Sequence, residues 1–265
     1  MTPLSAGNAR LKEIRKLGRR AVRAERRQFL ADGPKAVEGA LSVPGCVVEV
    51  FATSEGLATY ADLLGDASAT VVDERALAGL SDSVSPAGVV ALCRFLDVPL
   101  GQALGASGES AETRLVAICA DVRDPGNAGT VIRCADAAGA SGVVLAGDSV
   151  DLYNPKTIRA SVGSAFHVPI AVERDPLAAV AAAKEAGLTV LAADMHGEAD
   201  IFDADDLLEQ PTAWLLGNEA WGLPPELAAA ADHVVSIPIF GRAESLNLST
   251  AAALCLYASA RAQRR

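Results

Sequence analysis

The chain has 265 residues, of which 51% are hydrophobic and 21% are charged; this excludes a disordered chain and suits one large or two small globular domains. Its formal net charge of −10, taken as a total, argues against nucleic acid as a partner. No stretch of about 18 apolar residues lacks charge, and the first twenty residues contain no apolar signal segment, so we expect a cytoplasmic protein without a membrane span.

Positive charge is concentrated at the start of the chain. Residues 1–27 hold nine Lys or Arg and two Glu, a net charge of +7, which leaves −17 for the remainder. A basic arm on an acidic body is typical of a contact with a polyanion, although a solvated amphipathic helix would carry the same charges. Within residues 8–27, Leu11, Ile14, Leu17 and Ala21 follow a helical spacing, so the sequence predicts a helix there.

The rest of the first 96 residues alternates between helix and strand patterns. Asp32 is the expected N-cap of a helix over residues 35–41, with Pro34 in its first turn. Strands are expected at 47–52, 70–72 and 88–95, and helices at 55–64 and 74–80. These elements predict a small α/β domain over residues 1–96. Residues 97–113 are rich in Gly and Ser and predict a linker.

Longer elements begin at residue 114. Strands are expected at 115–122, 142–146, 168–172, 188–193, 212–216 and 233–237, and helices at 177–186, 224–231 and 246–263, with one more that ends at 138. Strands that alternate with such helices indicate an α/β domain with a mainly parallel sheet covered on both faces, here over residues 114–265. Ligands of such sheets bind at the carboxyl ends of the strands.

Cysteine and histidine are not arranged for a disulfide framework or a metal site. The five cysteines are scattered and mostly stand in apolar runs, so we expect reduced, buried side chains. No CxxC pair occurs and the three histidines are far apart in the sequence, so we expect no metal.

The first polar segment of the larger domain is Asp124–Arg133 (DPGNAGTVIR), directly after an expected strand. Asn127 is the expected N-cap of the following helix, and Gly129 permits close approach of another group. Arg133 stands in an otherwise apolar helix, which favours a function, although an ordinary strand-to-helix turn with an arginine that reaches solvent also fits. The segment has neither the GK[ST] of a P-loop nor the GxGxxG of a dinucleotide fold.

Two more polar segments follow later strands. Residues 215–224 (LLGNEAWGLP) contain Asn218 and Glu219 in an open loop that suits a small polar ligand, or that is an ordinary loop with Gly222 at positive φ. Residues 237–249 (IPIFGRAESLNLS) place Ser245 and Asn247 at the start of the last helix. The free N–H groups there attract polar ligand atoms, although helix capping alone explains both residues.

Together, the three segments resemble the motifs of the SPOUT-class RNA ribose 2′-O-methyltransferases of the SpoU/TrmH type in residue types, order and spacing. Residues 154–164 (NPKTIRASVGS) are similar to the connecting segment of that family. Residues 26–33 (RRQFLADG) and 81–88 (SDSVSPAG) resemble its ribosomal-protein-like RNA-binding domain, so the resemblance covers nearly the whole chain. One departure is Ala220-Trp221, where a Gly often follows the Glu; Trp221 would narrow the loop or add a stacking surface.

The resemblance implies a mainly parallel α/β domain with a trefoil knot, S-adenosylmethionine as methyl donor, and an active site completed across a homodimer. The catalytic residues that it implies are Asn127, Arg133, Glu219, Ser245 and Asn247. Donor contacts, largely through backbone, are implied for Gly217, Ile237 and Leu246, and we add Asn218, Asn247 and Met195. RNA contacts are expected from Arg10, Arg15, Arg19, Arg26, Arg27, Lys156 and Arg159.

The resemblance also implies roles for these side chains. A guanidinium stays protonated in proteins, so we expect Arg133 to grip an RNA phosphate and polarise the ribose hydroxyl rather than act as a base. Asn127 and Asn247 would fix the ribose and donor geometry, and Glu219 and Ser245 would orient Arg133 and Asn247.

We therefore predict an S-adenosylmethionine-dependent enzyme that methylates a ribose 2′-hydroxyl in structured RNA. The two-domain layout favours ribosomal (23S) RNA over transfer RNA. The alternatives are a non-catalytic RNA-binding or ribosome-assembly protein and an unrelated nucleotide-binding α/β enzyme. The expected partners are RNA and a second copy of the chain, with no membrane and no metal.

Overall fold

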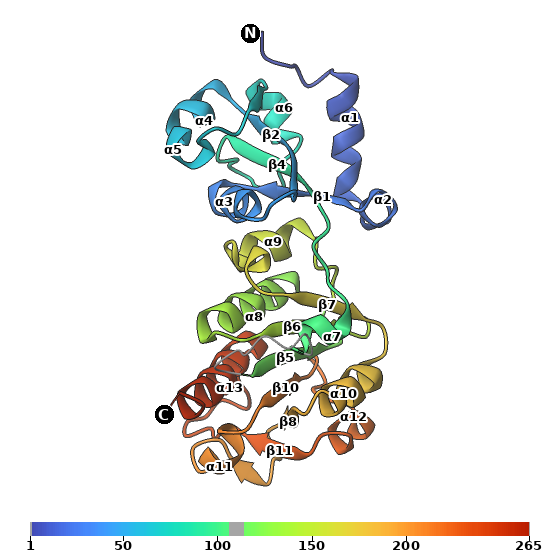
Figure 1. Cartoon of the computed structure of the whole chain (residues 1–265), viewed down its shortest axis with the longest axis vertical. Helices are drawn as coiled ribbons and strands as arrows, with labels where there is room; N and C mark the ends of the chain where they lie inside the picture. The colour runs from blue at the N-terminus through green and yellow to red at the C-terminus, as the bar shows by residue number, and fades with distance from the viewer. Residues whose placement is uncertain (1, 106–113, 265) are drawn as a thin grey trace. The chain divides into compact units, whose positions relative to one another are not determined.

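The computed structural model describes residues 2–105 and 114–264, which form two compact units (Figure 1). The first unit comprises Met1–Leu96 with Tyr153–His167, and the second comprises Asp97–Leu152 with Val168–Arg265. The sequence placed continuous domains at 1–96 and 114–265. The structure differs in that Tyr153–His167 groups with the first unit and the start of the expected linker groups with the second. The remainder of that linker, residues 106–113, lies outside the described residues.

The first unit is built on a four-stranded sheet with the order β1-β4-β2-β3. Its strands are β1 (Gln28–Asp32), β2 (Val47–Ala52), β3 (Ala69–Val71) and β4 (Val89–Arg94). The sequence did not predict β1, which pairs antiparallel with β4 from Gln28 to Asp32. The expectation that Asp32 caps the next helix is therefore wrong. Asp32 ends the strand, and Gly33, with φ of 90°, precedes the helix.

The basic arm forms two helices rather than one. Helix α1 (Ala9–Arg15) passes into a 3-10 turn (Lys16–Gly18), and α2 (Arg20–Arg26) begins after Arg19, whose backbone is extended. Leu11, Ile14 and Leu17 are buried in the core of the first unit, as their spacing predicts. The other helices of this unit are α3 (Pro34–Ser42), α4 (Ser54–Thr59), α5 (Ala61–Leu64), α6 (Glu74–Ala78) and α9 (Pro155–Ser161), with a second 3-10 turn at Ser164–Phe166.

The second unit contains a seven-stranded sheet with the order β7-β6-β5-β10-β8-β11-β9. Every pair of neighbouring strands in it is parallel, which confirms the predicted architecture. The trefoil knot stays a prediction. The strands are β5 (Leu115–Ala120), β6 (Gly142–Ala146), β7 (Ile170–Glu173), β8 (Thr189–Ala193), β9 (Ala199–Asp200), β10 (Thr212–Leu216) and β11 (His233–Ser236).

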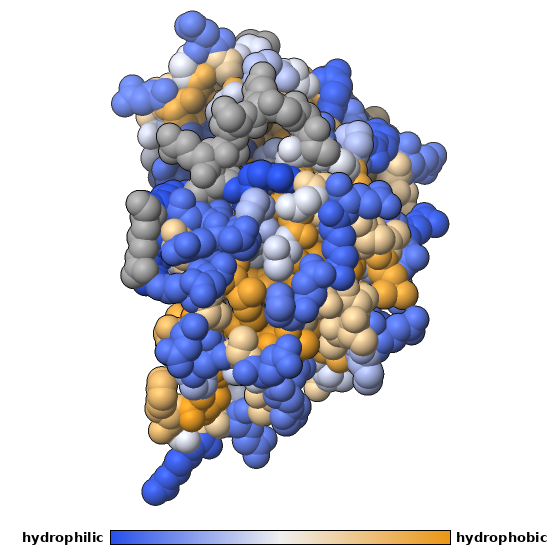
Figure 2. Space-filling model, turned by 60° about the horizontal axis from the view of Figure 1, so that its bottom comes forward, coloured by the Kyte–Doolittle hydropathy of each residue, from blue (hydrophilic) through white to orange (hydrophobic). Residues whose placement is uncertain are grey.

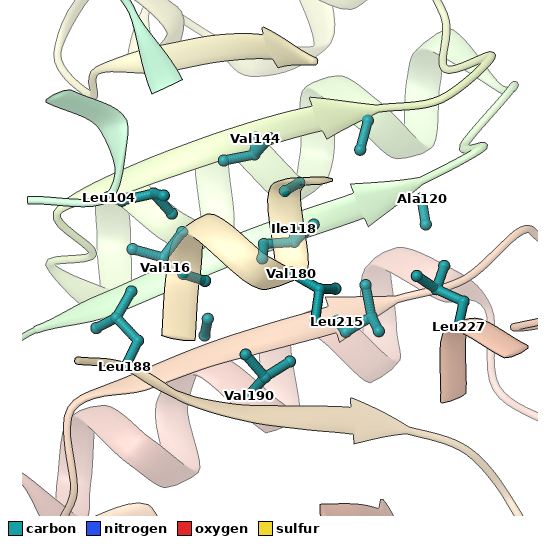
Figure 3. Close-up of a cluster of buried hydrophobic side chains, with 14 of the residues drawn as sticks. Leu104, Val116, Ile118, Ala120, Val144, Val180, Leu188, Val190, Leu215 and Leu227 are labelled. Atoms are coloured by element: carbon teal, nitrogen blue, oxygen red, sulfur yellow. The ribbon is translucent and has the colours of Figure 1, made fainter. Parts of the chain in front are cut away.

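Helices cover both faces of this sheet. Leu104, Val180 and Leu227 belong to one core cluster with Ile118 and Leu215 of the sheet (Figure 3). Side chains alternate across a strand, so Trp214 points to the opposite face, where its indole N–H donates to Ser259 (2.9 Å). The helices are α7 (Leu100–Ala103), α8 (Pro125–Ala138), α10 (Pro176–Glu185), α11 (Asp205–Leu208), α12 (Pro225–Ala229) and α13 (Leu248–Ala262).

The carboxyl ends of β5, β10 and β11 lead into the three polar segments singled out in the sequence, and that of β8 leads to Met195. Because parallel strands end at the same edge, these segments share one edge of the sheet. Within the described part of the chain, no helix is both long and apolar enough to cross a membrane.

Candidate active site

The turn after β5 is held by two aspartates. Asp124 is the N-cap of α8 and accepts a hydrogen bond from the Asn127 N–H (2.8 Å), so the expectation that Asn127 caps this helix is wrong. Asn127 lies inside the first turn, which frees its amide for other contacts. Asp121 has a positive φ of 55°, and its carbonyl accepts from the Asn218 side chain (2.6 Å). The polar loops after β5 and β10 are thereby joined.

Glu219, which follows β10, accepts three hydrogen bonds from residues at the start of α8 and directly before it. Its carboxylate accepts from the backbone N–H groups of Arg123 (3.3 Å) and Asp124 (3.1 Å) and from Asn127 Nδ2 (3.1 Å). The resemblance implies that Glu219 contacts Arg133, whereas in the structure Glu219 contacts Asn127. Glu219 therefore fixes the rotamer of Asn127 by accepting a hydrogen bond from its side-chain amide.

Asn247 connects the third segment to the same group. Its Nδ2 donates to Asn127 Oδ1 (3.1 Å), while its Oδ1 caps α13 by accepting from the backbone N–H of Ser249 (2.9 Å). A chain of hydrogen bonds thus runs from Glu219 through Asn127 to Asn247, residues from three distant parts of the sequence. Ser245, which was expected to orient Asn247, is exposed and makes no hydrogen bond with it.

The loop from Gly217 to Gly222 is closed on itself. Asn218 and Gly222 exchange two backbone hydrogen bonds (3.0 and 2.9 Å), and Gly222 has φ of 68°. A Cβ on Gly217 would lie 2.5 Å from the backbone of Gly222, so only glycine fits at 217. The loop is therefore held closed at the end of β10, with Gly217 and Asn218 buried and residues 219–221 exposed.

Arg133 lies on α8 almost two turns beyond Asn127 and is exposed to solvent. It makes no hydrogen bond or ion pair with any residue that the structure describes. The nearby Cys134 thiol has its pKa raised by partial burial, an effect that the positive charge of Arg133 opposes. A charged, exposed guanidinium on the same helix as Asn127 is suited to bind an anion.

The residues expected to hold the methyl donor lie around the same edge. Met195 follows β8 and is 60% exposed, Ile237 follows β11 and is partly buried, and Leu246 precedes α13. Met195 and Leu246 thus expose apolar side chains at the edge where polar loops converge, a combination that suits an adenine ring with its polar edges and so fits S-adenosylmethionine. Figure 2 shows apolar surface in patches between hydrophilic side chains on one face of the molecule. The described residues contain no cluster of three or more His, Cys, Asp or Glu that could hold a metal ion.

The sequence did not identify Arg123, which lies over the ring of Trp221 at 5.1 Å from its centroid. Arg123 also lies 3.8 Å from a carboxylate oxygen of Asp148. Trp221 is 55% exposed, and both residues neighbour members of the hydrogen-bonded chain. In the sequence, the only indication of this pair was Trp221, which departs from the family motif.

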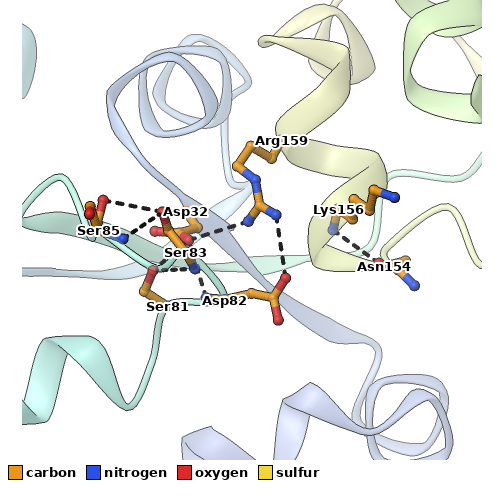
Figure 4. Close-up of polar contacts among 8 residues, drawn as sticks. All are labelled: Asp32, Ser81, Asp82, Ser83, Ser85, Asn154, Lys156 and Arg159. Carbon is orange, nitrogen blue, oxygen red and sulfur yellow. Dashed lines mark hydrogen bonds and ion pairs between the residues drawn. The ribbon is translucent and has the colours of Figure 1, made fainter. Parts of the chain in front are cut away.

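Most cations expected to contact RNA are already engaged inside the first unit. Arg10 pairs with Glu49 and Arg26 with Glu13, and Arg27 lies over Phe95. The guanidinium of Arg15 lies against Gly79, but its buried Nε and Nη2 have no hydrogen-bond partner among the described residues. Arg159 lies 3.4 Å from Asp82 and 3.9 Å from Asp32 (Figure 4). Lys156 and Arg19 are exposed. Contact of these side chains with RNA stays a prediction.

Two hollows of about 230 Å³ each flank the buried carboxylate of Asp32 in the first unit. Asp32 accepts from the Ser81 hydroxyl (2.7 Å), so the segment that resembles the RNA-binding domain packs directly on β1 (Figure 4). Lys35 and Arg159 line one hollow, and Arg15 and Asn154 line the other. Basic side chains therefore line both hollows.

Comparison with known proteins agrees with this geometry. The SpoU rRNA methylase family model matches residues 114–257, and a model for an MRM3-like substrate-binding domain matches residues 8–91. A 23S rRNA (guanosine(2553)-2′-O)-methyltransferase of Bacillus subtilis, RlmP, is 32% identical over 96% of each chain. The chain belongs to the SpoU rRNA methylase family.

Solved structures lead to the same conclusion. A crystal structure of an RNA 2′-O ribose methyltransferase aligns with a TM-score of 0.84 at 33% identity, over 99% of both chains. An AdoMet-bound rRNA methyltransferase from Sinorhizobium meliloti aligns with a TM-score of 0.83 at 33% identity, over 98% of this chain and 97% of that one. These matches confirm the predicted enzyme class, a ribose 2′-O-methyltransferase of RNA, and S-adenosylmethionine as its donor. They contradict a non-catalytic RNA-binding protein and an unrelated nucleotide-binding enzyme.

Proposed function

We propose that this enzyme methylates one ribose 2′-hydroxyl of 23S ribosomal RNA and that it acts as a homodimer in the cytoplasm. Its catalytic centre would consist of Arg133 and the hydrogen-bonded residues Glu219, Asn127 and Asn247. The observation that carries the proposal is this hydrogen-bonded chain, because it brings three distant polar segments to one edge of the sheet. The ribosomal target is supported by RlmP, a relative of nearly equal length.

The residues implied for the donor are Gly217, Asn218, Ile237, Leu246, Asn247 and Met195. Bound S-adenosylmethionine supplies a methyl group on a sulfonium, which the ribose oxygen must approach in line. The rigid Gly217 loop would set the donor's position through backbone contacts, and Met195 would bound the adenine side. A preset geometry of this kind lowers the entropy lost on the way to the transition state.

Arg133 would hold an RNA phosphate and polarise the adjacent 2′-hydroxyl. It remains protonated, so the hydroxyl proton passes to phosphate or water rather than to the guanidinium. Asn127, with its rotamer fixed by Glu219 and Asn247, would orient the ribose. The energetic contribution of these groups is positioning and charge stabilisation, and neither requires a metal.

The first unit would carry most of the RNA contact, and a second copy of the chain would cover part of the second unit. On α13, Leu254 (40% exposed) and Tyr257 (53% exposed) offer an apolar face. Their exposure supports the homodimer that the resemblance implies.

A methyl-transfer assay tests the proposal. Ribosomal RNA from cells that lack the gene is incubated with the enzyme and S-adenosylmethionine, and 2′-O-methyl positions are mapped. Arg133→Ala should lower the rate about a hundredfold or more, because one positioned cation is removed from the transition state. Arg133→Lys should restore only part of the rate, since lysine lacks the planar fork.

The matched control is Arg261→Ala at the far end of α13, where the side chain pairs with Asp205. This variant should methylate RNA at the normal rate. Donor affinity, measured by calorimetry, should be unchanged in every variant. Normal turnover by Arg133→Ala would remove Arg133 from the mechanism, and no new 2′-O-methyl group in 23S RNA would refute the proposed target.

A further inference from the structure

Trp221 is exposed although the loop that carries it is firmly held. Asn218 and Gly222, on either side of it, exchange two backbone hydrogen bonds, and the Ala220 N–H donates to Asn218 Oδ1 (2.8 Å). Asn218 is itself anchored through its side chain to the Asp121 carbonyl. The indole nevertheless remains 55% exposed. The ring is thus presented to solvent by a rigid loop.

Arg123 ties the ring to the catalytic network. Its guanidinium lies over the Trp221 ring at 5.1 Å, and its backbone N–H donates to Glu219 (3.3 Å). The same carboxylate holds Asn127. Arg123 therefore contacts the ring through its guanidinium and Glu219 through its backbone. A cation over one part of an indole also limits the rotamers that the ring adopts.

We infer that Trp221 is a stacking surface for a nucleobase of the RNA substrate, either the base of the methylated nucleotide or its neighbour, with Arg123 as the group that holds the ring in place. This inference rests on the proposed function. Proteins that recognise particular RNA nucleotides take unstacked bases onto aromatic side chains. Such a base offers a π-face that an exposed indole can cover.

Charge favours stacking as the source of affinity at this edge. Residues 28–265 carry a net charge of −17. The guanidinium over the ring lies 3.8 Å from Asp148, and the backbone N–H of Arg123 donates to Glu219. General attraction of phosphates is therefore weak here, whereas stacking on an aromatic ring needs no excess of positive charge. An RNA base matches this surface better than an acidic peptide would.

The chain offers a direct optical test because it has only two tryptophans. Trp214 is fully buried and bonded to Ser259, so acrylamide should quench only the emission of Trp221. Two probes of equal length and charge are compared, a twelve-nucleotide oligoadenylate RNA and the corresponding abasic RNA. We expect the adenine oligomer to protect Trp221 from acrylamide at least twofold better than the abasic oligomer. Trp221→Ala should remove the quenchable emission altogether.

Variants separate a base contact from a general structural role. On 23S RNA, Trp221→Ala should raise KM about fivefold or more, in line with the removal of one stacked base, while Trp221→Phe should recover part of the affinity. Arg123→Ala should raise KM less than Trp221→Ala, and Arg123→Lys should recover only part of the difference, because lysine keeps the charge but lacks the planar guanidinium. Affinity for S-adenosylmethionine and the urea midpoint should stay unchanged in all four variants.

Three results would overturn the inference. Equal protection by both oligomers would assign the effect to phosphates, and an unchanged KM for Trp221→Ala would show that the ring is not used. Protection that appears without RNA as the protein concentration rises would assign the ring to an interface between two copies of the chain. These failures leave methyl transfer intact, whereas failure of the proposed target removes methyl transfer to 23S RNA while protection by the adenine oligomer persists.

Discussion

Glu219 illustrates how one side chain organises a site through acceptor capacity alone. A carboxylate only accepts hydrogen bonds, and here it takes two backbone N–H groups and the Asn127 amide. The remaining amide oxygen of Asn127 is taken by Asn247. Because each partner fixes the next, the amide orientation of Asn127 is fully determined by its neighbours.

Replacing that carboxylate should disturb Asn127 more than it disturbs the fold. In Glu219→Gln, one acceptor oxygen becomes an NH₂ donor that faces backbone N–H groups. We expect methyl transfer to fall about tenfold and stability in urea to fall by about 1 kcal/mol, a small decrease because Glu219 is exposed. The measurement is a double-mutant cycle with Asn127→Ala, in which the two decreases in rate should not add. Additive decreases would show that Glu219 acts independently of Asn127.

The short connections between elements show a second use of a carboxylate. Asp232, directly before β11, accepts from the Val190 N–H of β8 (2.9 Å) and pairs with Lys184 of α10 (2.8 Å). Burial raises the pKa of Asp232, whereas the hydrogen bonds from Lys184 and Val190 lower it. The lowering effects outweigh burial, so the pKa lies below its ordinary value. The ionised carboxylate therefore stabilises the junction of three elements.

This junction should weaken in acid. A carboxyl with a lowered pKa in the folded state contributes stability above its ordinary pKa of about 4 and loses it as pH falls through the lowered value. Asp232→Asn should cost about 0.5 kcal/mol at pH 7, since both partners are partly exposed, and almost nothing at pH 2. Urea midpoints of both proteins across this range provide the measurement. A difference that is the same at every pH would contradict the assignment.

The sequence predicts those elements best whose signal is local. The strands at 47–52, 142–146 and 212–216 have the expected bounds because each is an apolar run between polar turns. Strand β1 was missed because its apolar run is only Phe29–Ala31 and its partner β4 lies far along the chain. The expected single helix at 8–27 is interrupted at Arg19, whose backbone is extended. No residue pattern in this segment predicts that interruption.

The candidate site also has features that the sequence predicts and features that only the structure shows. The three polar segments are recognisable in the sequence, and their convergence follows from a parallel sheet. The pairing of Glu219 with Asn127 rather than Arg133 depends on loop geometry, including the positive φ of Asp121. Tertiary context of that kind is not encoded in residue spacing, so the partners of individual side chains required the structure.

For the molecule as a whole, deletion of the basic arm is a poor test of RNA binding, because Leu11, Ile14 and Leu17 belong to the core of the first unit. Arg19 and Arg20 are exposed and make no ion pair with a described residue, so the variant Arg19→Ala/Arg20→Ala is the cleaner test. It should weaken RNA binding and lower the slope of log affinity against log salt by about 0.7–0.9 for each phosphate that the variant no longer neutralises.

The matched control is Arg10→Ala, since Arg10 is already paired with Glu49 and should contribute little to RNA binding. Filter binding of 23S RNA at several salt concentrations measures all three proteins, with circular dichroism as the check on folding. An unchanged slope in Arg19→Ala/Arg20→Ala would show that the arm is only a solvated pair of helices.

Self-association is the second property of the whole molecule that the surface predicts. Leu254 and Tyr257 expose apolar area on α13, which a second copy would bury. Sedimentation at low micromolar concentration should give twice the mass of one chain, and Leu254→Glu should shift it toward the monomer and abolish methyl transfer. A monomer with full activity would contradict an active site shared between two chains.

The first unit also cannot be completed in the order in which its residues are synthesised. Tyr153 stacks on Phe95 with centroids 3.7 Å apart and contacts Phe29 at 4.7 Å, yet β5 and β6 of the second unit are made before it. Domains normally fold one after another as they leave the ribosome. Here the aromatic face of β1 stays uncovered until part of the next unit already exists, so a chaperone that acts during translation would meet this exposed face first.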